Sequence, residues 1–540
     1  MQATKSKRGS KTYVSYLVRE AFRTAQGPRS RTVCNISGLP PEVRELITAA
    51  LAGKPCVALE TLELQSAPSY GGLAVLRDAW QRFGLDRILE AIPDARPRAL
   101  LQAMVFGRVL CPSSKRALAE QAEGTLLAAA CGLDQGDEAF DEDELYEAMD
   151  ALNGRWVAIE KALYGQAFPE RVSLVLYDLT SVYFEGKGPV GVGAYGYSRD
   201  HRPERPQVLL AVATDAEGVP IHVEVLRGNR ADTTPLQGLL QALKRRFGLK
   251  EATFVFEGGM SSRLNLEALE KEHLPFVTRL SAASLPEVLA ALPQESQPEL
   301  WDRTQLLEVT AEGKRYVIAS GPERQPRDRA RREARLAKAQ AELARLADVK
   351  RKKPDAQKLA SQAGRALQRL KAHKYFDYHV DAQGRLQWQK KAALIEAEQS
   401  RDGFYLLHTS LAPAQGDKGQ VLGHYKNLLA VEAAFGQLKS HLEVRPVYPF
   451  RPDRVRNHVR LCFLAYWLCA RLGQEWRAKG ERAEVPRLLR RLQAVRVGTV
   501  RVAGQTVRRL LTQIPSELNA VLERLGLLHL FGQPPPWAQA

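Results

Sequence analysis

The chain has 540 residues, of which 45% are hydrophobic and 26% are charged, and its formal net charge is +17. This length exceeds what one compact core accommodates, so we expect several domains in a globular, soluble protein. The excess of Lys and Arg favours a polyanionic partner, most commonly nucleic acid, although a merely basic protein fits as well. No run reaches the length of a membrane span and the amino terminus lacks an apolar signal segment, so we expect a cytoplasmic location.

Two features that could suggest metal sites have simpler interpretations. The six cysteines lie far apart and form no CxxC pair, which indicates neither a zinc site nor a disulfide framework. The acidic run DEAFDEDELYEAMD (137–150) lacks the glycine and the ligand alternation of a calcium loop. We therefore expect reduced, buried cysteines and a solvated helix start.

The first third of the chain predicts a small hairpin followed by helices. Within residues 11–35, KTYVSYLVREAF and RTVCNIS flank the polar turn TAQGPRS, as in a β-hairpin. PPEVRELITAALAG then predicts a short helix, and apolar residues recur at helical spacing over 72–165. We expect a hairpin and helix region over 1–70 and a helical domain over 71–168.

Residues 172–280 differ in character and predict a mixed sheet. Short apolar runs typical of buried strands recur as VSLVLYD, QVLLAVAT, VPIHVEVL, ATFVFE and FVTRL. The turn DAEG joins the second and third runs, and amphipathic helical segments precede the last two. Three antiparallel strands followed by alternating helices and strands predict an α/β fold, with a mixed sheet flanked by helices.

Residues 281–400 interrupt this sheet before the strand-like run DGFYLLHTS. They contain strand-like pieces around a helical hairpin whose inner positions keep coiled-coil spacing: Leu336, Ala339, Leu343, Leu346, Leu359, Ala363, Leu367 and Leu370. Arg and Lys crowd its outer face, which fits a solvated coiled-coil face or a DNA-backbone contact equally well. We expect a core from 169–280 and 401–475, an α+β insertion domain over 281–400, and a C-terminal region over 476–540.

The stretch Tyr425–Arg445, YKNLLAVEAAFGQLKSHLEVR, predicts an amphipathic helix. Its spacing places Tyr425, Leu428, Glu432 and Lys439 on one face. The opposite, apolar stripe consists of Val431, Ala434, Phe435, Leu438 and Leu442. On this stretch alone, an ordinary helix with a solvated face is the simpler interpretation.

Two further carboxylates end apolar runs. Asp178 ends the first predicted strand, and Glu257 ends another just before Gly258 and Gly259. An ionised carboxylate at the end of a buried strand is costly unless it is capped, paired or bound to a metal. Each residue alone fits an ordinary strand-end turn, but with Glu432 they form the set of three carboxylates that two-metal phosphodiester cleavage needs.

The chain resembles bacterial insertion-sequence DDE transposases, whose RNase H-like core is interrupted by an insertion domain before the final catalytic Glu. The resemblance covers nearly the whole chain and rests on TYVSYLVREAF, YDLTSVYFEG, YGYSRDHRPERPQ, GNRADTTPL, EGGM, DGFYLLHTS and VEAAFGQLKSHLEVRPVYPFRPDRVRNHVRLCFLAYWL. The stretch from Tyr425 also fits the family's signature spacing Tyr-(2)-Arg-(3)-Glu-(6)-Lys.

The resemblance implies a role for each matching residue. Asp178, Glu257 and Glu432 would be catalytic and hold Mg²⁺ or Mn²⁺, with Glu257 where the family has its second Asp. Tyr425 and Lys439 would lie near the scissile phosphate. Further DNA-backbone contacts are expected from Arg199, Arg202, Arg205 and Arg445, and a wider positive surface from Arg454, Arg456 and Arg460. Trp301 and Trp388 fit stacking on a flipped base or, more simply, ordinary packing.

The implied function is that of a transposase that binds terminal inverted repeats and catalyses metal-dependent DNA cleavage and strand transfer. Its partners would be double-stranded DNA, as transposon ends and target, and a second copy in a homodimer on DNA. Its location would be the nucleoid of a bacterial cytoplasm. Glu257 replaces the family's Asp and Leu428 its signature Arg. These departures leave open a catalytically impaired or repurposed transposase that only binds DNA and, less favoured, a nuclease without strand transfer.

Overall fold

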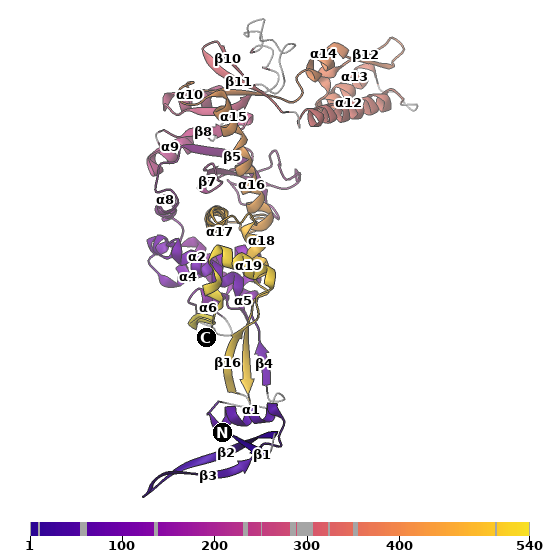
Figure 1. The fold of residues 1–540 in the computed structure, drawn as a ribbon. Coiled ribbons are helices and arrows are strands. Elements are labelled where there is room, and N and C mark those ends of the chain that lie inside the picture. Colours follow the sequence, from indigo (N-terminus) through magenta and orange to yellow (C-terminus); the bar gives the residue numbers. More distant parts are fainter. Residues whose placement is uncertain are drawn as a thin grey trace.

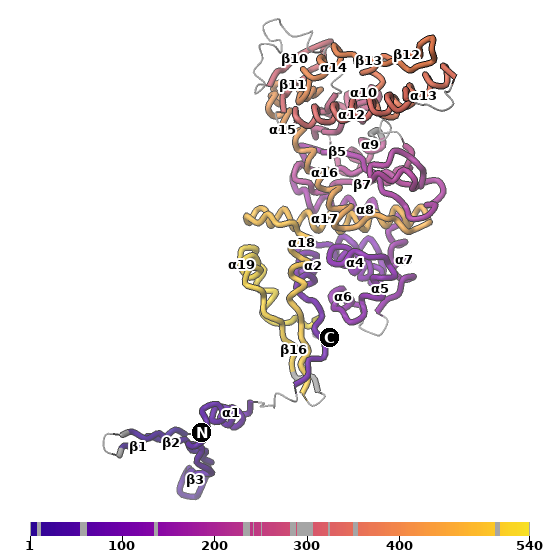
Figure 2. The backbone as a smooth tube through the Cα atoms, turned by 90° about the vertical axis from the view of Figure 1, so that its right-hand side faces the viewer, coloured from indigo at the N-terminus to yellow at the C-terminus, as the bar shows by residue number. Residues whose placement is uncertain are grey.

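The computed structural model is elongated, with an N-terminal sheet at one end, a helical insertion at the other, and a large mixed sheet between them (Figures 1 and 2). It describes residues 2–8, 11–54, 62–133, 139–230, 236–249, 251–280, 306–321, 324–348, 355–502 and 505–538, together with Ser284 and Val288.

The N-terminal region forms the predicted hairpin, widened by a third strand. β2 (Lys11–Thr24) and β3 (Gly27–Asn35) pair antiparallel, and β1 (Gln2–Arg8) adds to the other edge of β2. Gly27 has a φ of +108°, which a glycine adopts without strain at this tight turn. The helix α1 (Pro41–Leu51) follows, starting at a proline as predicted.

The helical region contains seven α-helices in its described part: α2 (Gly71–Arg82), α3 (Leu85–Ile88), α4 (Ala95–Leu110), α5 (Lys115–Ala122), α6 (Leu127–Ala130), α7 (Glu142–Asp150) and α8 (Trp156–Ala167). The acidic run starts α7, as predicted. Asp141 and Glu144 form a capping box there, with Asp141 accepting a 2.8 Å hydrogen bond from the Glu144 amide.

The central sheet has eight strands in the order β10-β11-β14-β9-β8-β5-β6-β7. Their bounds are β5 (Leu174–Tyr183), β6 (Gln207–Thr214), β7 (Pro220–Arg227), β8 (Thr253–Phe256), β9 (Phe276–Leu280), β10 (Leu307–Ala311), β11 (Lys314–Ser320) and β14 (Phe404–Thr409). The β5–β8 and β8–β9 pairs are parallel and the other pairs are antiparallel. The predicted fold class, a mixed α/β sheet flanked by helices, is confirmed.

The two faces of this sheet are covered differently. On one face, α9 (Leu236–Phe247) and α10 (Arg263–Lys271) close a compact cluster around Val175, Tyr177 and Phe254. On the other face, α15 (Lys418–Lys426) packs on β8, β9, β11 and β14, and α16 (Leu428–Gly436) packs on β5 and β6. Because successive side chains of a strand point to opposite faces, each strand residue faces either the side covered by α9 and α10 or the side covered by α15 and α16.

The insertion is smaller than the segment predicted from the sequence. The hairpin of β10 and β11 pairs with β14 and so belongs to the central sheet. The physical reason is that β11 is buried from Arg315 through Ala319, which requires sheet partners and cover on both sides. The remaining insertion consists of α12 (Gln325–Ala347), α13 (Ala356–Arg369), β12 (Phe376–Val380), β13 (Leu386–Lys390) and α14 (Ala392–Gln399).

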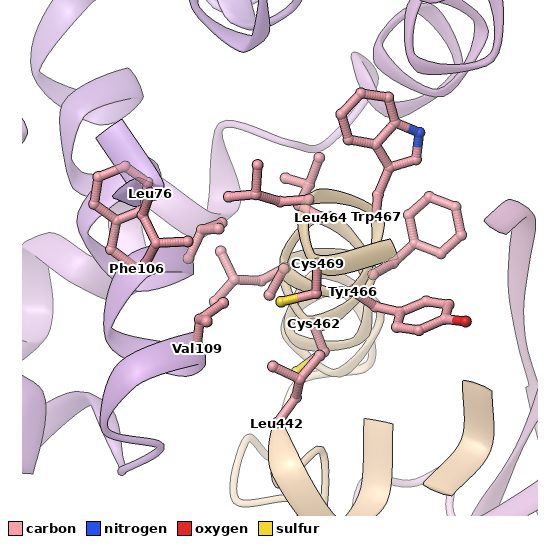
Figure 3. Packing of buried hydrophobic residues seen from close by; sticks show 14 of the residues in the cluster. Leu76, Phe106, Val109, Leu442, Cys462, Leu464, Tyr466, Trp467 and Cys469 are labelled. Carbon is pink, nitrogen blue, oxygen red and sulfur yellow. The ribbon is translucent and has the colours of Figure 1, made fainter. Parts of the chain in front are cut away.

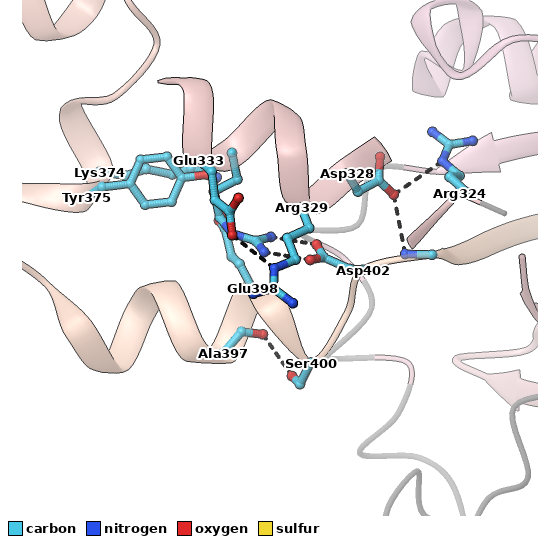
Figure 4. Close-up of polar contacts among 12 residues, drawn as sticks. Arg324, Asp328, Arg329, Glu333, Lys374, Tyr375, Ala397, Glu398, Ser400 and Asp402 are labelled. Carbon is cyan, nitrogen blue, oxygen red and sulfur yellow. Dashed lines mark hydrogen bonds and ion pairs between the residues drawn. The ribbon is translucent and has the colours of Figure 1, made fainter. Parts of the chain in front are cut away.

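The predicted inner face of the helical hairpin is confirmed, because seven of its eight residues are buried in one cluster and Leu370 lies at its edge. Charged contacts fix its base to β14. Arg332 makes a bidentate pair with Asp402, with both distances 2.5 Å. Asp328 pairs with Arg324 and accepts a hydrogen bond from the amide of Gly403 (Figure 4). The insertion is thus anchored by a buried ion pair.

The long helix α17 (Pro452–Ala478) joins the sheet to the helical region. Its residues Cys462, Leu464, Trp467 and Cys469 lie in the same cluster as Phe106 of α4 (Figure 3). After α17 come α18 (Val485–Leu492), β15 (Val497–Val502), β16 (Gln505–Leu511) and α19 (Ser516–Leu525). β15 pairs with both β16 and the N-terminal strand β4 (Leu62–Ser66). None of the helices in the described ranges is long and apolar enough to cross a membrane.

Candidate active site

Three acidic residues, Asp178, Glu257 and Glu432, are directed to the same side of the central sheet. Asp178 lies in the middle of β5, two residues after Leu176, which joins the cluster under α16. Glu257 directly follows β8 in extended backbone and continues the alternation of Val255, which belongs to the same cluster. Glu432 lies in α16, which packs on β5. The middle of β5, the end of β8 and the helix α16 therefore each carry one carboxylate on the same side of the sheet.

The position of Asp178 differs from the prediction that it ends its strand. β5 continues for five residues to Tyr183, with Asp178 paired to Val212 of β6. The residues LTSVY after Asp178 keep the β-branched and aromatic composition that favours a strand. Asp178 is therefore a nearly buried carboxylate within a strand. Burying an ionised carboxylate there costs more free energy than placing it at a strand end.

Burial and neighbouring carboxylate charges raise the pKa of Asp178 and of Glu432. Burial raises the pKa of Asp178 to about 7, a hydrogen bond from the Leu179 amide opposes this, and the charges of Glu257 and Glu432 add to it. The pKa of Glu432 is raised first by partial desolvation and then by Glu257. A cation at this site would relieve the repulsion and restore the ionised forms.

The signature residues do not share one helix face, contrary to the prediction. Tyr425 lies in α15, Glu432 lies in α16, and Lys439 lies in a π-helical turn, Gln437–His441. Leu428 is only 7% exposed and packs into the core. The cause is the junction at Asn427, whose carbonyl accepts a hydrogen bond from the amide three residues later and so changes the phase of the helix.

Lys439 and Arg445 converge on an aspartate that sequence reasoning missed. Lys439 Nζ and Arg445 Nη1 both lie 2.8 Å from Oδ1 of Asp200, whose side chain is 5% exposed. Asp200 Oδ2 is buried and has no hydrogen-bond partner among the described residues. Burial lowers the pKa of Lys439, while the contact with Asp200 opposes that change. In this conformation, a phosphate could reach Lys439 only by replacing Asp200.

The four arginines predicted as backbone contacts lie around the end of β5. Arg199 lies near enough to both Asp178 and Lys439 for its charge to lower the pKa of each. Arg202 and Arg445 lie over the Tyr183 ring at 5.6 and 5.9 Å. Arg205 forms a 3.0 Å ion pair with Glu185. These four arginines thus lie together at the end of β5 and are called the basic rim below. Their ion pairs and ring contacts were not predicted.

The expected extension of this rim along α17 is not observed for two arginines. Arg454 pairs with Asp150 of α7 at 2.9 Å. The pKa of Arg460 falls to about 10 because the side chain is buried, and its guanidinium lies over the Trp156 ring at 5.5 Å. Both join α17 to the helical region, whereas Arg456 is exposed.

The tryptophan of the insertion packs within its own domain. Trp388 lies in the small insertion core, with its ring 5.9 Å from that of Phe376. This supports ordinary packing for Trp388. Trp301 lies outside the described residues.

Arg279, at the end of β9, is another residue that sequence reasoning missed. Its charge lowers the pKa of Tyr425, opposing the rise that burial causes, and its guanidinium lies over the Tyr405 ring at 5.4 Å. In the parallel β8–β9 pair, Phe256 is opposite Thr278, so Glu257 and Arg279 are the next residues of two adjacent strands. The Arg in the apolar run FVTRL was visible in the sequence. Its position beside Glu257 follows from the pairing of β9 with β8, which the sequence does not give.

A mixed sheet flanked by helices, with three carboxylates directed to one of its sides, defines the class of this protein as α/β. Residues 171–468, more than half of the chain, match the family "Transposase DDE domain". The chain therefore belongs to the DDE transposase family.

Two transposase structures resemble the chain weakly. A piggyBac transposase synaptic complex with hairpin DNA shows 10% identity and a TM-score of 0.40, covering 82% of this chain and 77% of that one. A Mos1 transposase paired-end complex with the left transposon end shows 20% identity and a TM-score of 0.15, covering 33% of this chain and 56% of that one. The assignment rests on the family match alone. The comparison with curated proteins finds no match.

DDE transposases typically use a divalent metal ion, and the donor chemistry of this site fits one. The three side chains supply only carboxylate oxygens, the ligands that hard divalent cations prefer. In the described part of the chain, none of the three carboxylates forms an ion pair with a basic side chain. Among the same residues, no group of three or more His, Cys, Asp or Glu is gathered closely enough to hold a metal ion. The donors are thus of the right type but are not drawn together.

Proposed function

We propose that this chain is a DNA transposase that binds the terminal inverted repeats of an insertion sequence and catalyses DNA cleavage and strand transfer. The observation that carries the proposal is the convergence of Asp178, Glu257 and Glu432 on one face of the sheet. Burial, with smaller contributions from the charges of Glu257 and Glu432, raises the pKa of Asp178 to about 7, which is expected of a site that operates with a bound cation.

In this proposal, Asp178, Glu257 and Glu432 hold Mg²⁺ or Mn²⁺. The ions, when bound, make an oxygen nucleophile available and stabilise the leaving oxygen of the phosphodiester. Water attacks first at the element's end, and the freed 3′-hydroxyl then attacks the target DNA. Lys439, Tyr425 and the rim of Arg199, Arg202, Arg205 and Arg445 hold the DNA backbone.

The proposed partners are double-stranded DNA and a second copy of the chain. The net charge of +17 supports a polyanionic partner, since phosphate contacts supply most of the affinity for DNA. Two element ends must be held together for transposition, which a homodimer on DNA achieves. The proposed setting is the nucleoid of a bacterial cell.

The test incubates the purified chain with duplexes carrying the element's inverted repeats and with Mg²⁺ or Mn²⁺. We expect cleavage at the repeat end, followed by joining to plasmid DNA, and loss of both in Asp178→Ala and Glu432→Ala. Arg263→Ala is the matched surface control, because Arg263 is 90% exposed and lies on α10, across the sheet. Cleavage that persists in Glu432→Ala but not in Asp178→Ala would overturn the three-carboxylate assignment.

A second candidate function is that of a catalytically impaired or repurposed transposase that only binds DNA. Glu257 supports it, because it carries one methylene more than the family's Asp, and so does the lack of a gathered metal site in the described ranges. Wild-type binding without cleavage, with cleavage gained in Glu257→Asp, would favour this alternative. Cleavage by the wild-type chain that is lost in Glu257→Asp would exclude it.

A further inference from the structure

Arg279 lies beside the acidic site through the register of two parallel strands. Phe256 of β8 is opposite Thr278 of β9, and Thr278 Oγ1 donates a 3.0 Å hydrogen bond to the Phe256 carbonyl. The next residues are therefore neighbours: Glu257 directly follows β8, and Arg279 lies beside it in β9, where it also pairs with Leu407 of β14. The backbones are so close here that a Cβ on Gly258 would be 2.4 Å from the Arg279 carbonyl oxygen.

The side chain of Arg279 points to the same face as the carboxylates. Val277, two residues earlier, belongs to the cluster under α15 and α16, so Arg279 is on that side by strand alternation. Its guanidinium lies 5.4 Å from the Tyr405 ring centre, and its charge opposes the rise that burial causes in the pKa of Tyr425. The Tyr405 and Tyr425 rings meet edge to face at 6.1 Å. The Tyr405 ring, itself packed against Tyr425, thus holds the guanidinium on the side of the sheet that carries the carboxylates.

Arg279 forms no ion pair with a carboxylate among the described residues, whereas its basic neighbours do. Arg324, which shares the Tyr405 ring at 4.7 Å, pairs with Asp328 at 3.3 Å. Lys439 and Arg445 both pair with Asp200. Arg279 is therefore an oriented and only partly buried cation whose ion-pairing capacity is available to a ligand.

The ligand chemistry follows from this arrangement. A guanidinium binds a phosphate through two parallel hydrogen bonds, which a lysine cannot do. Three carboxylates repel approaching DNA, and a guanidinium on the same side of the sheet offsets part of this repulsion. The signature helix supplies no guanidinium at Leu428, which is buried in the core.

We propose that Arg279, oriented by Tyr405 and Tyr425, binds a backbone phosphate of the DNA next to the acidic site. Arg279 thereby supplies from β9 the guanidinium that Leu428 cannot offer. This inference rests on the proposed function only in taking DNA as the ligand, and it requires no cleavage.

The experiment measures binding of a fluorescein-labelled duplex of mixed sequence by the full-length chain, in EDTA, over a series of salt concentrations. We expect Arg279→Gln to bind about tenfold more weakly and to lower the slope of log K against log salt by about 1, the value for one lost phosphate contact. Arg279→Lys should retain the slope and recover part of the affinity, because it keeps the charge but not the planar fork. Arg263→Gln removes the same charge across the sheet and should change neither.

Arg279→Gln with the wild-type slope and affinity would overturn the inference, and so would equal losses in Arg279→Gln and Arg263→Gln. The Arg279→Lys variant separates a lost contact from misfolding, since a folding defect would weaken binding without a charge-dependent slope. The two proposals can fail separately. If the chain does not cleave DNA but Arg279→Gln weakens binding as expected, the proposed activity is wrong and the phosphate site at Arg279 stands. If the chain cleaves DNA but Arg279→Gln has no effect on binding, the proposed activity stands and the phosphate site is wrong.

Discussion

Lys115 is a buried cation whose removal should make the protein more stable. It is the first residue of α5 and is 5% exposed, and its Nζ lies 3.3 Å from Nδ1 of His458 on α17. Burial, together with the neighbouring charge of Arg108, lowers the pKa of Lys115 to about 7. His458 in turn contacts the Val444 carbonyl at 3.2 Å, so the cluster adjoins the segment after the signature helix.

The cost of this burial can be estimated from the pKa. The difference between the ordinary value of 10.5 and about 7, at about 1.36 kcal/mol per pH unit, is about 5 kcal/mol. Because the folded pKa lies below the unfolded one, the unfolded chain binds the extra proton. The cost is therefore complete below pH 7 and disappears above pH 10.5, so the stability of the wild-type protein should rise between these values.

We expect Lys115→Met to be more stable than the wild type by several kcal/mol near pH 6 and to lose this advantage toward pH 10. Methionine fills the path of the lysine stem without a charge. Urea unfolding followed by tryptophan fluorescence at a series of pH values gives both curves, and Lys161→Met, at an exposed site on α8, is the control. A difference between Lys115→Met and wild type that does not change between pH 7 and pH 10 would refute the reasoning.

Three further substitutions test particular contacts. Arg332→Met leaves Asp402 buried and unpaired, which should cost about 3–5 kcal/mol in urea unfolding and be largely recovered by adding Asp402→Asn. Gly258→Ala brings a Cβ to 2.4 Å from a backbone oxygen and should cost about 1–3 kcal/mol, whereas Gly423→Ala, with nothing within 4 Å, should be neutral or stabilising. Asp417→Ala removes the capping box of α15 and should cost about 1 kcal/mol, with faster amide exchange in its first turn.

Each of these expectations has a contrary result. An unchanged unfolding curve for Arg332→Met would mean that water reaches Asp402 in solution. Equal effects of Gly258→Ala and Gly423→Ala would contradict the close approach of β8 and β9. Unaltered amide exchange in Asp417→Ala would show that packing, not capping, fixes the start of α15.

Short-range patterns predicted most of the elements because their causes are local. The apolar runs between residues 172 and 280 became β5 to β9, since a run buried on both faces needs no knowledge of its partner. The helix start in the acidic run was likewise predicted, because the residues that cap α7 satisfy amides of their own helix.

Features that depend on distant partners were not predictable in this way. The β10–β11 hairpin looked like part of an insertion until its pairing with β14 placed it in the central sheet. The acidic set Asp178, Glu257 and Glu432 was anticipated, but its neighbours Arg279 and Asp200 depend on strand register and loop packing that no local spacing encodes. The helix break at Asn427 was also not predictable. The periodicity of the stretch places Leu428 on the face of Glu432, whereas Leu428 is buried in the core.

The pairing of β4 with β15 makes the two termini of the polypeptide dependent on each other. A fragment that stopped after α17 would leave Leu62–Ser66 as an unpaired edge, and a fragment that began at the helical region would expose β15 in the same way. Exposed strand edges recruit other chains, so both fragments should be prone to aggregation. Shortened versions of this protein are therefore best designed by removing β4, β15 and β16 together.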